Sequence, residues 1–287
     1  MVTSVWKIMW REIRFDKLAL TGLVLFAVAV AVVFIWAVTI DQDAATMVRL
    51  GSINQPPSAQ YLLGTDPGGR DMLPMLILSA RNSLIVTFIV TLSGAGIGIL
   101  FGLFAGFYGG HVDNILMRLL DFFEMIPPIM LIIVLVSLIP NYTAVHFALI
   151  LVLIWSWQGT ARLIRAKGLQ QGTLDYVSAS KTLGTPNIVI IFREVAPNLV
   201  SIIVSNFTIN LAANMGIETG LTFLGFGLPF ATPSLGALVF HAATPAHLTG
   251  RLWLWLPAAL FIIIMMLCVN FVGQALNRAA DAKKRTV

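Results

Sequence analysis

The sequence predicts an all-α membrane protein with about six transmembrane helices, and three observations lead to this prediction. Of its 287 residues, 58% are hydrophobic and only 11% are charged, and the mean hydropathy is +0.89. A soluble domain usually carries about 25% charged residues, so this chain lacks the polar surface that water requires. Long charge-free stretches recur along the chain, and most basic residues lie in the connections between alternate stretches.

A helix needs about 20 apolar residues to cross the hydrocarbon core of a bilayer, and the charge-free stretches mark the expected spans. The first is longer than the roughly 7–15 apolar residues of a signal peptide, so we expect an uncleaved anchor. Pro140-Asn141 is a turn signal that separates the third span from the fourth. The expected spans are roughly residues 18–40, 82–108, 115–139, 144–164, 198–225 and 252–277.

These spans divide residues 1–287 into one transmembrane domain with an outer loop at 41–80 and a cytoplasmic loop at 166–197. If the N-terminus lies inside, fourteen of the eighteen lysines and arginines fall on the cytoplasmic side. The four that fall outside are Arg49, Arg70, Arg81 and Arg251. Cytoplasmic loops carry such an excess of basic residues, so we expect both termini in the cytoplasm. The basic residues form no dense patch interleaved with aromatics, which argues against nucleic acid as a partner.

The second expected span carries glycines at every fourth position, a spacing that places them on one helix face. They are Gly94, Gly98, Gly102 and Gly106. Without side chains on that face, another helix can approach closely. The sequence leaves open whether this contact is static packing or a contact that moves during function.

The expected cytoplasmic loop, residues 166–197, is polar enough to leave the membrane but contains helix signals. Thr173 is expected to cap a short helix that ends at Gly184. Thr185 and Pro186 are expected to start a second helix, with Pro186 at its first position and its end before Pro197. Two short ordered helices outside the lipid suit a docking surface for a partner, and an amphipathic segment lying on the bilayer is the alternative.

The residues of the first short helix and a later proline match a known pattern. They are Tyr176, Val177, Ser178, Ala179, Ser180, Lys181, Thr182, Leu183, Gly184 and Pro197. This segment resembles the EAA loop of ABC importer permeases. Ala179, Gly184 and Pro197 keep the family spacing, whereas Ser178 replaces the glutamate and Ser180 replaces the second alanine.

Further stretches are similar to the C-type subunits of the dipeptide, oligopeptide and nickel importer permeases, and the resemblance covers nearly the whole chain. These stretches are residues 62–66, 69–71, 79–84, 106–110, 222–227 and 232–236. In the loop, Glu194 stands where peptide permeases often carry histidine. The resemblance implies a type I ABC importer permease fold and a multi-pass protein of the bacterial inner membrane. It implies transport of peptides, with nickel chelates or other small solutes as the alternative cargo.

The resemblance also implies a set of partners. A homologous B-type permease subunit would complete the pore, two cytoplasmic ABC ATPases would bind the residues of the EAA-like loop, and an extracytoplasmic binding protein would deliver substrate. The chain has no glycine-rich phosphate loop of its own, so we expect it to bind no cofactor. ATP and magnesium are then expected in the ATPase subunits, and the chain itself is expected to be non-catalytic.

Three ionisable residues in or near the expected spans are candidate pore-lining residues, because an unpaired charge in a membrane is costly. Asp121 lies three residues after Arg118, so we expect these two to pair along one helix face. Glu124 precedes Pro127-Pro128, which should kink the helix. Glu218 is the only charge in a long apolar region, and either a pore role, in which it meets the amino terminus of a peptide, or a hydrogen bond to a neighbouring subunit would explain it.

In the outer loop, Asp66, Arg70 and Asp71 are candidate contacts for the binding protein. Together with Arg81 they are more simply explained as an ion-pair network that fixes the loop. A secondary transporter or channel is the alternative from another class, but the sequence shows no clear inverted repeat and such a protein would not need the docking loop. The sequence shows no nucleophile–base pair or metal-ligand constellation, so neither a catalytic nor a metal site is expected.

Overall fold

A computed structural model describes residues 2–285, with the side chains of residues 6–280. Within these residues the elements are all helical, and the β pairing is limited to an isolated bridge between Thr65 and Asp71. The predicted all-α fold is therefore confirmed. Four helices are long and apolar enough to cross a membrane. They are α2 (Lys17–Thr39), α4 (Met72–Tyr108), α12 (Val200–Phe223) and α15 (Leu256–Arg285).

Two bent helix pairs raise the number of candidate spans to as many as six. Helices α5 (Gly110–Met125) and α6 (Pro128–Leu138) meet at 74°, because Pro127 before α6 and Pro128 at its first position lack the N–H groups that would continue the backbone hydrogen bonds of α5. The second pair bends by 41° between its two halves. It consists of α7 (Ala144–Leu151), the π-helix η2 (Val152–Ser156) and α8 (Gln158–Gly172).

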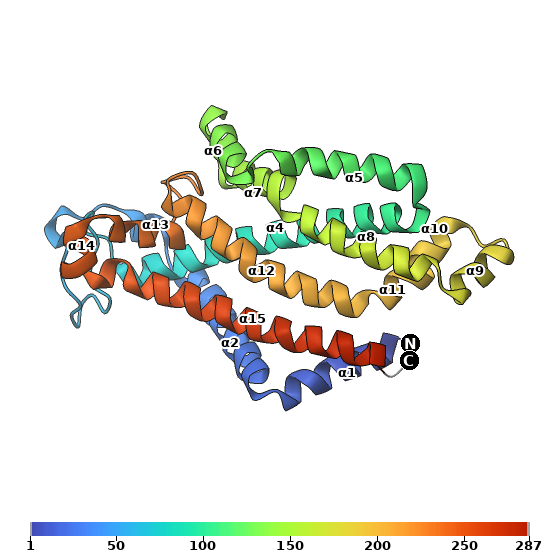
Figure 1. Cartoon of the computed structure of the whole chain (residues 1–287). Helices are drawn as coiled ribbons and strands as arrows, with labels where there is room; N and C mark the ends of the chain where they lie inside the picture. Colours follow the sequence, from blue (N-terminus) through green and yellow to red (C-terminus); the bar gives the residue numbers. More distant parts are fainter. Residues whose placement is uncertain (1, 286–287) are drawn as a thin grey trace.

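The short elements gather at the two ends of the helix bundle (Figure 1). At one end lie α1 (Val2–Phe15), α9 (Asp175–Thr182), α10 (Asn187–Ile190), the π-helix η3 (Ile191–Val195) and α11 (Ala196–Asn198). At the other end lie α3 (Gln42–Thr46), η1 (Leu50–Ser52), α13 (Leu235–Phe240), η4 (His241–Ala243), α14 (Pro245–Gly250) and η5 (Leu252–Leu254).

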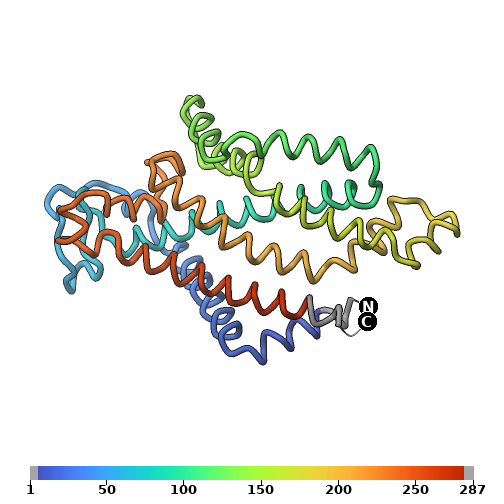
Figure 2. The backbone as a smooth tube through the Cα atoms, viewed as in Figure 1, coloured from blue at the N-terminus to red at the C-terminus, as the bar shows by residue number. Residues whose placement is uncertain are grey.

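The loop between α8 and α12 thus lies at the same end of the bundle as α1 and the C-terminal end of α15, as the backbone trace also shows (Figure 2). The outer loop of the sequence analysis lies at the opposite end. Because α1 and the C-terminal end of α15 lie at the same end of the bundle, the chain crosses the bundle an even number of times. The placement of the first end in the cytoplasm stays a prediction.

The glycine face of α4 is a helix contact, as the sequence predicted. Gly94, Gly98, Gly102 and Gly106 all lie against the segment from η2 to α8. A Cβ atom added at Gly102 would lie 2.6 Å from the carbonyl oxygen of Ala161, and one at Gly106 would lie 2.5 Å from that of Arg165. Only glycine permits this approach, so the backbones of α4 and α8 pack directly against each other.

Candidate functional site

The loop between α8 and α12 contains two short helical segments, as expected. Helix α9 ends next to Gly184, which has a φ of +78°. Glycine adopts this left-handed conformation without strain, so it terminates the helix and lets the chain turn back. The chain then returns to the bundle through α10, η3 and α11 and enters α12 at Val200.

Three details of this loop differ from the predictions. Thr173 ends α8 instead of capping the next helix, because its hydroxyl donates to the carbonyl of Gln170 at 3.0 Å. Pro186 precedes α10 as its cap and is not its first helical residue. The second helix does not stop before Pro197 but continues through η3 into α11, where Pro197 occupies a first-turn position that needs no N–H donor.

Helix α9 is anchored to the bundle by one buried side chain. Val177 is 0% exposed and lies in an apolar cluster that joins the loop to three long helices. The cluster contains Leu103, Phe107, Ile164, Val177, Ile190, Ile191, Val195 and Leu199. Because these residues come from α4, α8 and the entry into α12 as well as from the loop, a displacement of α9 is transmitted to the spans.

The rest of α9 presents an open surface. The exposed residues are Ser178, Ala179, Lys181, Thr182, Leu183 and Gly184. Leu183 is 85% exposed, although its side chain is large and apolar. Small side chains beside an exposed leucine suit a surface that a partner protein covers. We call these six residues the coupling face.

A hydrogen bond that the sequence did not predict joins the two halves of the loop. The Ser180 hydroxyl donates to the carboxylate of Glu194, with 2.7 Å and 2.9 Å to its two oxygens. Nearby, the Tyr176 hydroxyl donates to the side-chain oxygen of Gln171 at 2.7 Å. Burial raises the pKa of the Tyr176 phenol, so this donor keeps its proton. Both bonds hold the half-buried side of the loop while the coupling face stays open.

Two of the candidate pore-lining carboxylates are paired with an arginine of α8. Arg162 donates from Nη2 to Asp121 at 2.7 Å and to Glu124 at 2.5 Å. The expected pair between Asp121 and Arg118 is wrong, because Arg162 reaches both carboxylates from the neighbouring helix. These side chains are each about half exposed. A second cross-helix pair joins Arg165 to Asp113 at 2.5 Å, so α5 is bound to α8 by charge.

Glu218 is 0% exposed in this conformation, so it lines no open path. The hydroxyls of Thr219 and Thr222 donate to its two carboxylate oxygens at 3.2 Å each, and Ser83 of α4 lies close to the carboxylate. Ser83 in turn accepts from the backbone N–H of Leu235 at 3.1 Å. Hydrogen bonds within this chain therefore hold the carboxylate, an arrangement that the sequence did not predict, and the hydrogen bond to a neighbouring subunit stays a prediction.

Glu218 also ends a row of polar residues that the sequence analysis missed. Asn206, Asn210 and Asn214 precede it on α12 at intervals of four residues, which places all four on one face of the helix. Asn206 accepts from the hydroxyl of Thr160 of α8 at 2.9 Å. Asn214 donates to the Thr91 hydroxyl of α4 at 3.0 Å. The four-residue repeat was the signal that would have revealed the polar face of α12, although not the helices α8 and α4 that contact it.

The outer loop contains one ion pair in place of the expected network. Arg70 lies 2.6 Å from the carboxylate of the buried Asp66, which also accepts from the backbone N–H groups of Gly68 and Arg70 at 2.8 Å. Asp71 instead caps α4 by accepting from the N–H of Leu73 at 3.0 Å. Arg81 donates to neighbouring amide side chains and forms no ion pair within the described part of the chain.

A cavity of about 710 Å³ opens at this end of the bundle, between the outer loop, α4 and the segment from α12 to η4. Asp66 and Arg70 line it on one side and His241 on another. Burial lowers the pKa of His241, which keeps it neutral at pH 7. The Ser79 hydroxyl in its wall is fully buried and has no hydrogen-bond partner among the described residues. The cavity is large enough to hold a small polar molecule.

Comparison with known proteins gives consistent results. The sequence model of the family described as binding-protein-dependent transport system inner membrane component matches residues 98–286. The oligopeptide transport system permease protein OppC of Lactococcus lactis subsp. cremoris (strain SK11) is 42% identical over 277 residues, which cover 96% of this chain and 94% of that protein. The dipeptide transport system permease protein DppC of Bacillus subtilis (strain 168) is 33% identical over 279 residues, which cover 96% of this chain and 85% of that protein.

A solved structure of the MetNI methionine ABC transporter in an inward-facing conformation contains a chain with a similar fold. Its TM-score is 0.57 at 19% sequence identity, and the match covers 73% of this chain and 97% of that chain. At this identity the likeness concerns the fold. It agrees with the type I importer permease fold that the resemblance implied.

Proposed function

The chain belongs to the family of binding-protein-dependent transport system inner membrane components, and we propose that it forms half of the translocation pore of an ATP-driven peptide importer. As a member, it is a permease component of an ABC importer and an inner membrane protein. Peptide as the cargo is supported by the names of two relatives that match nearly the full length of this chain, an oligopeptide and a dipeptide permease.

The coupling face is proposed to receive the ATPase subunits. The observation that carries this proposal is the contrast between its exposed residues and the buried Val177 directly beneath them. A partner that moves α9 also moves the apolar cluster around Val177, and with it α4 and α8. ATP binding would then shift the population between inward-open and outward-open states, because the two states present α9 differently to the ATPases. ATP and magnesium belong to those subunits in this proposal, and this chain binds no cofactor.

The remaining partners are assigned to the other surfaces. A homologous B-type permease subunit would complete the pore, and an extracytoplasmic binding protein would contact the outer loop around Asp66, Arg70 and Asp71. Asp121 and Glu124, which are partly exposed, remain proposed pore-lining residues. For Glu218 such a role would require a conformation different from this one, because its carboxylate is enclosed here. Both termini are proposed to lie in the cytoplasm with the coupling face.

The coupling face is tested by a matched pair of substitutions, Leu183→Asp and Leu50→Asp. Both leucines are strongly exposed, at 85% and 78%, and they lie at opposite ends of the bundle. A charge placed in an apolar contact costs about 2 kcal/mol or more, which is roughly a thirtyfold loss of affinity. We expect Leu183→Asp to lose the co-encoded ATPase subunits during purification, while Leu50→Asp retains them. Full retention by a folded Leu183→Asp protein would refute the assignment.

The cargo is tested in proteoliposomes that hold the complete transporter and its co-encoded binding protein. We expect ATP-dependent uptake of labelled peptides that unlabelled peptides inhibit and nickel chelates do not. Uptake of nickel chelate without uptake of peptide would refute peptide as the cargo, whereas the assignment as an ATP-driven importer would stand. Uptake driven by an ion gradient in the absence of ATP would reject the importer mechanism.

A further inference from the structure

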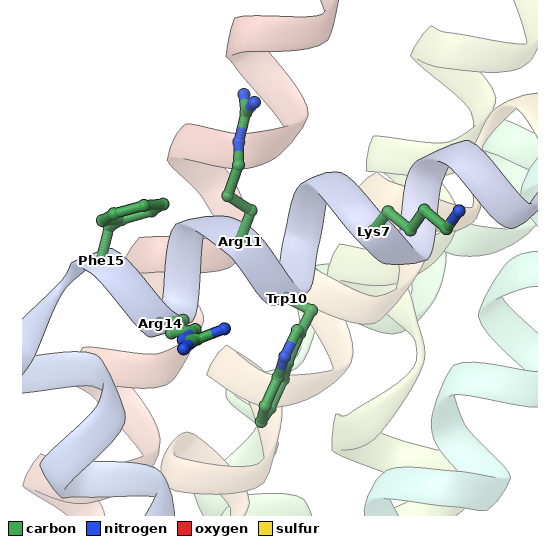
Figure 3. A pocket seen from close by; sticks show the side chains of 5 residues that line it. All are labelled: Lys7, Trp10, Arg11, Arg14 and Phe15. Carbon is green, nitrogen blue, oxygen red and sulfur yellow. The ribbon is translucent and has the colours of Figure 1, made fainter.

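Helix α1 carries a cluster of basic and aromatic side chains that the importer function does not use. Lys7, Arg11 and Arg14 recur at intervals of four and three residues, so they share one face of the helix. Together with Trp10 and Phe15 they line a shallow pocket of about 380 Å³. All five side chains are exposed. The side chains spread apart from this shared face: in Figure 3, Arg11 extends upward from the helix, and Trp10 and Arg14 extend downward.

The opposite face of α1 holds the helix in place. Met9 and Ile13 are buried in an apolar cluster with Ala275, Leu276 and other residues of α15. The basic face is therefore turned away from the bundle, and its direction is fixed by packing.

The carboxylates on α1 and at its end are already engaged elsewhere. Arg278 of α15 pairs with Asp16 and lies 3.9 Å from Glu12. Lys7, Arg11 and Arg14 have no ion-pair partner among residues 6–280. Three cations consequently share one small surface without a compensating negative charge from that part of the chain.

The position of the cluster selects its ligand. Helix α1 ends at Phe15, and Asp16 caps the apolar helix α2 that begins at Lys17, so Arg14 and Phe15 lie at the boundary of the hydrocarbon core. With a rise of 1.5 Å per residue, Lys7 lies only about 10 Å farther along the chain. The headgroup layer of one leaflet is roughly 5–8 Å thick, so the cluster spans this layer. Aromatic side chains favour the same depth.

We propose that the basic face of α1 is a binding site for the phosphate headgroup of an anionic phospholipid, with Trp10 and Phe15 against the upper part of its acyl chains. Arginine presents parallel N–H donors that match two phosphate oxygens, and lysine adds a third positive charge. The site would hold α1 at the membrane surface next to the end of α15. A protein partner on this face is the alternative occupant that the experiment separates from a lipid.

The test uses the full chain in its transporter complex and native mass spectrometry. The complex is titrated with phosphatidylglycerol or with phosphatidylcholine of identical acyl chains. Each basic residue near an anionic surface contributes about a fivefold gain in affinity. In the triple variant Lys7→Gln, Arg11→Gln, Arg14→Gln, the ratio of the affinities for phosphatidylglycerol and phosphatidylcholine should therefore fall by roughly 100-fold at low salt. The matched control removes three cations outside α1, through Arg118→Gln, Arg193→Gln and Arg251→Gln, and should keep the preference.

Measurements on the unsubstituted protein keep the proposal falsifiable if the triple variant does not fold. Bromine-labelled phosphatidylglycerol should quench the part of the tryptophan fluorescence that Trp10→Phe removes, and labelled phosphatidylcholine should quench it less. Equal binding of the two lipids would overturn the proposal. If millimolar inorganic phosphate displaced the labelled phosphatidylglycerol as effectively as unlabelled phosphatidylglycerol does, the cluster would be a site for free anions instead. Protection of Trp10 from both labelled lipids within the assembled complex would show that a protein covers the face.

Discussion

The hydroxyl of Ser180 on α9 donates to both carboxylate oxygens of Glu194 on η3, at 2.7 Å and 2.9 Å. These residues are fourteen positions apart, on opposite sides of the turn at Gly184. The bond closes the loop into one unit, and the carbonyl of Glu194 also accepts from the Asn198 amide at 2.9 Å. The position of α9 is therefore set by the segment that leads into α12.

Ser180→Ala should loosen this unit. A hydrogen bond to a charged group contributes about 1.5–3 kcal/mol when it is well protected, and this half-buried pair should contribute about 1 kcal/mol. We expect faster hydrogen exchange over residues 175–195 and weaker coupling of ATP hydrolysis to transport. Ser178→Ala removes an exposed hydroxyl from the same turn of α9 and is the control for the hydrogen exchange measurement. Equal exchange rates in both variants would mean that the bond does not order the loop.

The glycine face of α4 gives a second prediction, for Gly102→Ala. Its Cβ would lie 2.6 Å from the carbonyl oxygen of Ala161 and 2.8 Å from the Cβ of Ile164, so the helices must separate. Such overpacking typically costs about 1–3 kcal/mol, which should lower the melting temperature of the purified protein by several degrees. Gly96 lies on the same helix with no neighbouring heavy atom within 4 Å, so Gly96→Ala should leave the melting temperature unchanged or raise it.

Features that depend on residues close together in the sequence were predictable from the sequence. The charge-free stretches predicted helices because lipid admits few other structures, and the four-residue spacing of the glycines predicted their common face. Gly184 predicted a helix end because its conformation is local. The errors in the same loop, at Thr173 and Pro186, are also local and amount to one or two positions, which is the usual uncertainty of helix ends.

Arg162 gives a third prediction. Its guanidinium is shared by Asp121 and Glu124, so Arg162→Gln leaves two carboxylates close together without their cation. Because all three side chains are about half exposed, solvent screens the pair and we expect a loss of only about 0.5–1 kcal/mol in stability. Arg118→Gln, which the sequence had suggested as the partner of Asp121, should have no effect on thermal unfolding. A larger effect of Arg118→Gln would contradict the pairing seen here.

The partner of Asp121 shows why part of the site was not predictable. Spacing along one helix identified Arg118 as a neighbour, but Arg162 reaches Asp121 from forty-one positions away, across a contact that only the packed bundle creates. The Ser180–Glu194 bond and the contacts of the α12 polar row have the same origin. Asn206, Asn210 and Asn214 were visible as a repeat, yet the sequence does not tell which helix supplies their partners.

Glu218 gives the last prediction. Because its carboxylate is enclosed, a structural role and a contact with the substrate predict different effects of substituting it. Glu218→Gln keeps an oxygen that accepts from Thr219 or Thr222, so we expect a folded protein with uptake within about twofold of normal for peptides of any charge. Glu218→Leu removes both acceptors and leaves buried hydroxyls unpaired, at about 1–3 kcal/mol for each group.

Thermal unfolding and uptake of acidic, neutral and basic peptides would be measured together for the two Glu218 variants. The structural role requires that stability falls in Glu218→Leu while Glu218→Gln transports all three peptide classes alike. A Glu218→Gln protein that folds normally but loses basic peptides selectively would instead show that the carboxylate meets the substrate. Such a result would require a state in which α12 turns this face away from Ser83 of α4, since the side chain is enclosed between the two helices here.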